Sequence, residues 1–161
     1  MKKRIIKYLV LSCLLVFSFS CSNLKKQHEV TSIEFLSAPG AERLALPFSE
    51  AVRVGEMLYL SGQVGTVPGT TKLVSGGIKE ETRQTLENIK EILERNGSSL
   101  NRVFKCTVFL ADISEWPKMN EVYRTYFLKE PPARSAMAAS GLALNARVEI
   151  ECIALVSQEQ H

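Results

Sequence analysis

At residue 78 the spacing of apolar side chains changes from strand-like alternation to a helical period, and this change constrains the fold more than any other feature. From here the stripe recurs every three or four residues, with Lys and Glu on the other side. Its members are Ile78, Thr82, Leu86, Ile89 and Leu93. Gly97, directly after an Arg-Asn pair, is a helix stop signal. The pattern predicts one amphipathic helix set between strands.

The segment before this helix predicts a β-hairpin. Residues 51–54 and 57–60 are apolar runs that flank a Gly-Glu pair, which fits a two-residue turn. Residues 31–38 can add a strand at the start of the sheet. The stretch from 64 to 77 is rich in Gly, Thr and Pro, so we expect a loop there.

The segment after the helix predicts a strand, a second helix and two further strands. Residues 103–111 are β-branched and apolar, and residues 135–139 and 147–156 also fit strands. Between them, Ser114 is expected to cap a helix that tolerates Pro117 in its first turn. We interpret the Trp, Met and Tyr side chains of this second helix as core residues rather than as a stacking platform for a ligand.

The element order is therefore β-β-α-β-α-β-β, which predicts an α+β fold with a mixed sheet and two helices on one face. The strands are apolar on both sides, so the sheet face without helices needs a covering partner. Association with further copies of the chain is the simplest way to supply it.

The first 20 residues predict an export signal, with basic residues before a short apolar segment. That segment is shorter than the roughly 20 residues of a transmembrane helix. The Ser20-Cys21 step resembles the processing site of a bacterial lipoprotein. We expect a lipid anchor at Cys21, a tether over residues 21–30 and a single domain over residues 31–161, on the extracytoplasmic side of a membrane in the cell envelope. The alternatives are an ordinary secretory signal and an uncleaved anchor.

The positive net charge of the chain belongs to this signal. The sequence holds 20 Lys and Arg against 17 Asp and Glu, and four of these cations but no acid precede Cys21. The mature chain therefore carries 16 cations (20 less 4) against 17 acids, a net charge of −1. Without a basic surface there is no electrostatic basis for binding nucleic acid, which weighs against an RNA- or DNA-directed role.

Cys106 and Cys152 lie in separate apolar runs, and their spacing fits no paired metal motif. We interpret both as small buried hydrophobic residues. An exported location would also permit a disulfide between them, although the sequence does not show whether their strands are adjacent. The histidines, His28 and His161, lie outside ordered motifs, so we expect neither histidine catalysis nor a metal site.

Arg134 and Glu149 are the residues best suited to chemistry. The planar guanidinium of arginine matches a carboxylate, and a glutamate can position or deprotonate a water. Alternation along the last strand places Glu149 on one face and Cys152 on the other. From spacing alone, a plain salt bridge between Arg134 and Glu149, or exposure of both, is the favoured explanation, because Arg and Glu are common residues.

A set of short motifs runs in order through most of the chain, between residues 46 and 156. The motifs are Leu58-Tyr59-Leu60-Ser61-Gly62-Gln63-Val64-Gly65, Gln84-Thr85-Leu86-Glu87-Asn88-Ile89, Gly97-Ser98-Ser99-Leu100, Met119-Asn120-Glu121-Val122-Tyr123, Pro132-Ala133-Arg134-Ser135 and Val148-Glu149-Ile150-Glu151. Together they resemble the Rid family of reactive intermediate deaminases, also called the YjgF family. The resemblance implies a chorismate mutase-like fold, in which three subunits pack their sheets into a central barrel with ligand clefts between neighbours.

The resemblance also implies an activity, the hydrolysis of imines and enamines of 2-amino acids to 2-oxo acids and ammonia, without a metal or organic cofactor. Arg134 corresponds to the arginine that binds the substrate carboxylate, and Glu149 to the glutamate that holds or activates water. Ser61 and Gly62 correspond to residues that seat the ligand, and Asn120 to a polar residue of the cleft.

Two positions depart from the family pattern. Phe48 stands where many deaminases have tyrosine, so a phenolic hydroxyl is missing from the cleft. Ala136 stands where many have cysteine, at a position whose expected contacts are through the backbone. The alternative function is therefore a module outside the cytoplasm that binds small carboxylic acids without turnover.

Overall fold

The computed structural model describes residues 32–38, 40 and 46–156. The expected signal, the lipidation site Cys21 and the tether lie outside these residues. In chain order the described elements are β1 (Ile33–Leu36), β2 (Ala51–Val54), β3 (Met57–Leu60), β4 (Gln63–Val64), α2 (Ile78–Arg95), β5 (Val103–Leu110), α3 (Trp116–Tyr126), β6 (Ala133–Ala138) and β7 (Val148–Leu155), with short 3-10 turns at Leu100–Arg102, Ile113–Glu115 and Ala143–Asn145.

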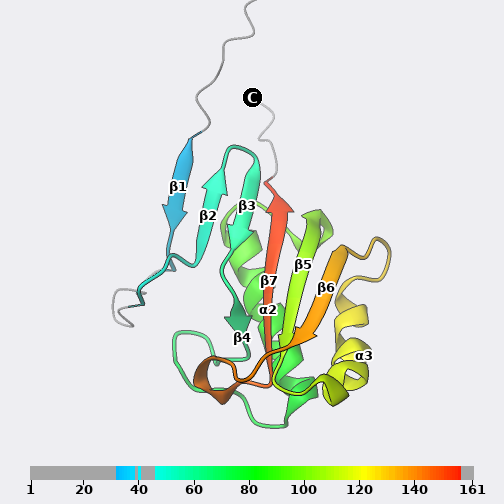
Figure 1. The fold of residues 1–161 in the computed structure, drawn as a ribbon. Helices are drawn as coiled ribbons and strands as arrows, with labels where there is room; N and C mark the ends of the chain where they lie inside the picture. The colour runs from blue at the N-terminus through cyan, green and yellow to red at the C-terminus, as the bar shows by residue number, and fades with distance from the viewer. Residues whose placement is uncertain (1–31, 39, 41–45, 157–161) are drawn as a thin grey trace, which may run out of the picture. The chain divides into compact units, whose positions relative to one another are not determined.

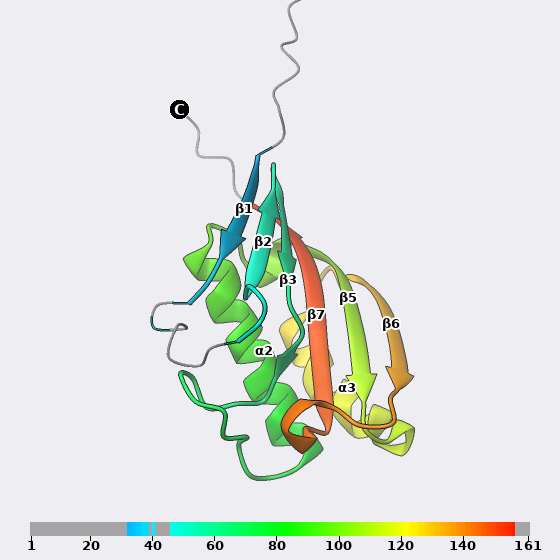
Figure 2. The ribbon, with the colours of Figure 1, turned by 60° about the vertical axis from the view of Figure 1, so that its left-hand side comes forward.

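The strands form one mixed sheet in the order β1-β2-β3-β7-β5-β6, with β4 also paired to β7 (Figures 1 and 2). β5 and β6 are parallel and are joined by the crossover that contains α3, while the other pairs are antiparallel. The predicted hairpin forms, with Ala51 opposite Leu60 and Val54 opposite Met57. The predicted mixed α+β sheet is confirmed, and β1 lies within the run expected to start it.

β4 is an addition to the predicted elements. The chain passes from β3 through Ser61 and Gly62 into β4, and both strands pair with β7. The sequence predicts a loop from Val64, but Val64 lies opposite Glu149 and extends the sheet. A strand this short shows no recognisable alternation.

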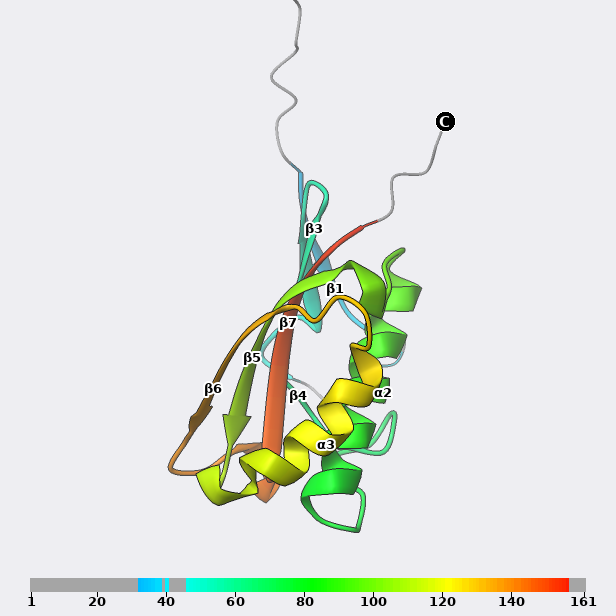
Figure 3. The same ribbon diagram turned by 90° about the vertical axis from the view of Figure 1, so that its right-hand side faces the viewer.

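α2 carries the predicted apolar stripe toward the core. Leu86, Ile89 and Leu93 are fully buried. The helix is bounded by Gly77 and Gly97, both at φ 73°, a backbone conformation that favours glycine. α2 and α3 lie on the same side of the sheet (Figure 3), as predicted. Neither of these two described helices is long and apolar enough to cross a membrane.

α3 begins at Trp116 and is not capped by Ser114. The Asp112 carboxylate accepts a hydrogen bond of 2.9 Å from the Ser114 amide and caps the 3-10 turn Ile113–Glu115 that precedes the helix. The predicted cap is wrong because Ser114 lies inside this turn, and Glu115 occupies the position that precedes α3. Pro117 does lie in the first turn, as expected.

β6 begins two residues earlier than predicted. Ala133 and Arg134 already pair with Lys105 and Cys106 of β5, so Arg134 belongs to the strand rather than to the preceding loop.

The sheet face away from the helices is rich in exposed apolar side chains. Cross-strand register places one set on this face, consisting of Ile33, Phe35, Met57, Tyr59 and Leu155. Their exposed fractions range from 36% for Met57 to 75% for Phe35, more apolar surface than isolated surface residues account for. The expectation that further copies cover this face stays a prediction.

Candidate active site

Arg134 lies on β6, the strand at one edge of the sheet. Its guanidinium carbon is 4.5 Å from the centre of the Tyr123 ring and 6.0 Å from that of Trp116, both on α3. The electron-rich face of an aromatic ring attracts a cation. The two rings therefore hold the guanidinium on the helix-covered side of the sheet.

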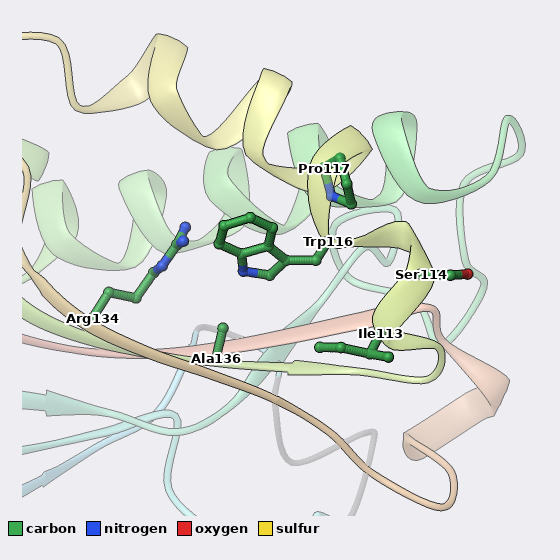
Figure 4. A pocket seen from close by; sticks show the side chains of 6 residues that line it. All are labelled: Ile113, Ser114, Trp116, Pro117, Arg134 and Ala136. Atoms are coloured by element: carbon green, nitrogen blue, oxygen red, sulfur yellow. The ribbon is translucent and has the colours of Figure 1, made fainter.

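An open pocket of about 490 Å³ lies beside this guanidinium. Figure 4 shows the Arg134 side chain extended beside the Trp116 ring. The lining residues are Ile113, Ser114, Trp116, Pro117, Arg134 and Ala136. Mostly apolar walls with one fixed cation suit a small molecule that carries a carboxylate next to an apolar group.

Arg134 forms no ion pair with a carboxylate in the described part of the chain. It lies opposite Cys106, which in turn lies opposite Cys152, so these three side chains share the helix-covered face. Glu149 precedes Cys152 by three residues on one strand and therefore points to the other face. A plain salt bridge between Arg134 and Glu149 is thus excluded within one chain.

Glu149 is half-buried on the face of β7 away from the helices. Burial raises the pKa of its carboxyl, and the neighbouring Glu151 charge adds to the rise. A carboxyl with a raised pKa is better suited to accept and return a proton near neutral pH. Gly62 packs directly against it, because a β-carbon at position 62 would overlap Glu149 Oε1 and lie 2.9 Å from Cδ.

Two hydrogen bonds from Ser61 anchor the backbone next to Gly62. Its hydroxyl donates a 2.7 Å hydrogen bond to the Ser49 carbonyl, and its amide donates one of 3.0 Å to the Glu50 carbonyl. These bonds hold the segment that follows Phe48 against the step between β3 and β4. The Phe48 side chain itself is exposed.

Asn120 lies half-buried on α3, four residues after Trp116 and three before Tyr123. Residues three and four apart share one face of a helix. Asn120 therefore lies on the same side of α3 as the two rings that contact Arg134, although it does not line the pocket.

Five of the seven predicted site residues fall into two groups within one chain. Ser61, Gly62 and Glu149 form one group, while Arg134 and Ala136 share the pocket on the opposite face. A site that uses both Arg134 and Glu149 must therefore combine two copies of the chain.

Sequence reasoning did not connect Trp116 and Tyr123 with Arg134. Tyr123 is buried as expected of a core residue, but its ring also supports Arg134, and Trp116 is 43% exposed and lines the pocket. The interpretation as core is therefore confirmed for Met119 and Tyr123 and wrong for Trp116. The separation of Trp116 and Tyr123 by seven residues, two helical turns, was the available signal, because it places both rings on one stripe.

Cys106 and Cys152 are buried, as predicted, and their strands prove to be adjacent. Both are free thiols in this structure. Within the described ranges, no group of three or more His, Cys, Asp or Glu is arranged to hold a metal ion.

The family model described as Endoribonuclease L-PSP matches residues 39–156, which include every element from β2 to β7. The chain belongs to the Rid (YjgF) family. Reactive Intermediate Deaminase A of Arabidopsis thaliana is 42% identical to this Rid protein over 137 residues, 85% of this chain and 70% of the plant protein. The 2-iminobutanoate/2-iminopropanoate deaminase of Mus musculus is 47% identical over 109 residues, 68% of this chain and 81% of the mouse protein.

Solved structures agree with this assignment. The Rid family protein YyfA of Yersinia pestis is 35% identical with a TM-score of 0.69, and the match covers 78% of this chain and 100% of that one. Yeast Mmf1 is 32% identical with a TM-score of 0.70, at the same coverage of both chains. The predicted family and its chorismate mutase-like fold are thereby confirmed.

Proposed function

We propose that this Rid protein hydrolyses imines and enamines of 2-amino acids to 2-oxo acids and ammonia. One observation carries the proposal: Arg134 presents a cation to an open pocket and pairs with no carboxylate among the residues that the structure describes. A half-buried cation held in this way is suited to bind a carboxylate from outside the chain. The names of the plant and mouse relatives support the reaction class.

The reaction needs little beyond orientation and proton transfer. Arg134 binds the substrate carboxylate through two parallel hydrogen bonds, which fixes the adjacent C=N carbon. Water adds to that carbon, a proton passes to nitrogen, and the C–N bond of the tetrahedral adduct breaks to release ammonia and the 2-oxo acid. An enamine first takes a proton at its β-carbon. Holding the water and the imine together makes the addition effectively unimolecular.

Glu149 of a neighbouring copy is the group that accepts the proton from water and returns it to nitrogen. Its raised pKa supports this role. Arg134 lies on the edge strand β6, where a second copy can approach it, and Glu149 lies on the open face that needs a cover. The homotrimer implied by the family resemblance brings one edge of each subunit against its neighbour.

The test is an imine-decay assay on wild type and Arg134→Ala. An amino-acid oxidase generates the imino acid, and its loss is followed with and without the Rid protein. Wild type should accelerate the decay, and Arg134→Ala should lower kcat/KM by about 100-fold, because two charge-assisted hydrogen bonds are lost. Arg83→Ala, which removes an exposed cation on α2 paired with Glu80, is the matched control and should keep full activity. An Arg134→Ala protein as fast as wild type would refute the proposal.

A module that binds carboxylic acids without turnover is the second candidate, favoured by Phe48 in place of a tyrosine. The deaminase names of the relatives weigh against it. Calorimetry with a 2-oxo acid separates the two: binding without any acceleration of imine decay would identify the module.

Cleavage of RNA, which the name of the family model mentions, is not favoured. The net charge of −1 on the expected mature chain gives no basic surface for a phosphate backbone.

We further propose that the protein is exported and lipid-anchored at Cys21. The basic and apolar segments of the first 20 residues and the Ser20-Cys21 step support this. Cys21→Ser should release the protein from membranes, whereas Cys13→Ser, within the apolar segment, should leave it bound. Retention of the Cys21→Ser protein would exclude this anchor.

A further inference from the structure

Cys106 and Cys152 form a buried pair at the centre of the sheet. They lie directly opposite each other on the antiparallel strands β5 and β7. Their Sγ atoms are 2.7 Å apart, although both residues are free thiols in this structure. Even carbon atoms, which are smaller than sulfur, are in optimal contact only at roughly 3.5–4.0 Å.

The backbone at this pair is suited to a covalent link. Opposed residues of antiparallel strands have Cα atoms about 4.5–5.5 Å apart. Disulfides span Cα separations of about 4.4–6.8 Å. The usual spacing of such opposed residues therefore falls within the range that a disulfide spans.

No other role for this cysteine pair is evident from the residues around it. Cys106 and Cys152 are 0% and 1% exposed. No third ligand for a metal ion stands with them among the described residues. Neither lines the pocket beside Arg134, so the proposed hydrolysis does not use them.

The two thiols differ in how readily they ionise. The hydrogen bond from Cys152 lowers the pKa of Cys106. The same contact, together with burial, raises the pKa of Cys152. Cys106 therefore loses its proton first, and a thiolate is the form that attacks a disulfide.

We propose that Cys106 and Cys152 are a modification site, joined in the mature protein by a disulfide across the centre of the sheet. The oxidant is a protein or small-molecule disulfide. The Cys106 thiolate attacks it, forms a mixed disulfide and displaces one thiol. Cys152 then attacks Cys106 Sγ and displaces the second thiol. Two S–H bonds are lost, one S–S bond forms, and the oxidant disulfide takes up two electrons and two protons.

The expected export of the chain supplies the setting, because disulfides persist outside the cytoplasm. Since folding buries both thiols, the link forms while β5 and β7 are coming together. The cysteines are 46 residues apart, and α3 and β6 lie within the loop that the link closes. Closing a loop of that length restricts the unfolded chain and stabilises the folded one.

The test uses the full chain, produced with its signal in an exporting host and purified in detergent without reductant. The protein is denatured, its free thiols are blocked with N-ethylmaleimide, and trypsin then cleaves after Lys105, Lys118 and Arg147. Mass spectrometry should find peptide 106–118 linked to peptide 148–161, lighter by two hydrogens than their sum. Maleimide on both Cys106 and Cys152, or a link from either one to Cys13 or Cys21, would overturn the proposal.

A second measurement tests the consequence on folded protein. A phosphine reductant should lower the Tm of wild type by on the order of 10 °C, given the length of the closed loop. Cys106→Ala and Cys152→Ala should show no response to the reductant. A wild-type Tm that stays unchanged although the reductant has demonstrably broken the link would refute the stabilising role. Because the imine assay is read separately, failure here and failure of the proposed hydrolysis are distinguishable.

Discussion

The side chain of Glu149 lies so close to the backbone of Gly62 that no other residue fits at position 62 without displacing it. Gly62 follows Ser61 at the break between β3 and β4, where the chain passes the N-terminal part of β7. The glycine is therefore required by a close approach rather than by a turn, and it fixes where the carboxylate can lie.

Gly62→Ala is expected to displace the Glu149 carboxylate, because the new β-carbon would overlap Oε1. We expect kcat in the imine assay to fall by about 100-fold, the lower range for loss of a general base. Gly141→Ala is the matched control, because a β-carbon there meets nothing within 4 Å. Equal activities for the two alanine variants would show that the Gly62 contact does not matter for turnover.

Glu149→Gln should lower kcat by roughly 10²–10⁴-fold with little change in KM, because the amide cannot accept a proton. In wild type the deprotonated carboxyl is the active form. Its activity should therefore rise with pH through a pKa above that of an ordinary glutamate, since burial raises it. The pH–rate profile of the residual Glu149→Gln activity should lack this limb. A limb at the same pH in both proteins would assign it to another group.

The same raised pKa has a consequence for stability. Between the unfolded and the folded pKa of Glu149, the folded state binds more protons than the unfolded state. Stability must therefore fall as pH rises through this window. The glutamine of Glu149→Gln does not ionise, so this variant does not lose stability as the pH rises. Its Tm should therefore exceed that of wild type above this pH window and approach it below the window. Calorimetric scans from pH 4 to 8 measure the Tm of both proteins. A Tm difference that stays constant across this range would contradict the prediction.

Sequence reasoning located both proposed site residues but not their arrangement. The period at Ile78 and the hairpin signal are local, so they sufficed to predict α2 and the β2–β3 pair. β4 was missed because its pairing with β7 is decided by a distant strand. The expected cap at Ser114 was wrong because Asp112 caps a 3-10 turn that already contains Ser114.

The separation of Arg134 and Glu149 onto opposite faces depends on which strands are neighbours. Alternation along one strand gives relative facing within that strand only. Arg134 takes its face from its register with Cys106, and Cys106 takes its own from Cys152. The residue pattern of a single segment does not show how these three strands are paired.

Tyr123 should be needed for its ring and not for its hydroxyl. Tyr123→Phe keeps a ring under Arg134. It removes a buried hydroxyl that forms no hydrogen bond within the usual distance and angle limits to the described residues. Tyr123→Leu removes the ring, which should weaken binding of a 2-oxo acid about tenfold through loss of the cation–π contact. Calorimetric Kd values for both variants decide the point, and equal affinities would show that Trp116 alone holds the guanidinium.

Glu81 should stabilise the start of β7. It is 6% exposed and its Oε2 accepts a 2.8 Å hydrogen bond from the Arg147 amide, just before the strand that carries Glu149. Glu81→Ala should lower the free energy of unfolding by about 1–3 kcal/mol, because the amide loses its acceptor. Glu81→Gln keeps an acceptor oxygen and should lose less. Urea unfolding monitored by circular dichroism measures both, and equal losses would assign the effect to the charge of Glu81 rather than to the hydrogen bond.

Mixing two inactive variants tests whether the site spans two copies. Arg134→Ala keeps Glu149, and Glu149→Gln keeps Arg134, so a site between one chain of each kind can contain both groups. If every site takes its arginine from one copy and its glutamate from the next, equal random mixing should restore about a quarter of the sites. The two variants are unfolded, combined and refolded, and native mass spectrometry verifies that mixed oligomers form. Each variant refolded alone is the control and should stay inactive. Mixed oligomers without recovered activity would place both groups in one chain, which the opposite facing of Arg134 and Glu149 across the sheet argues against.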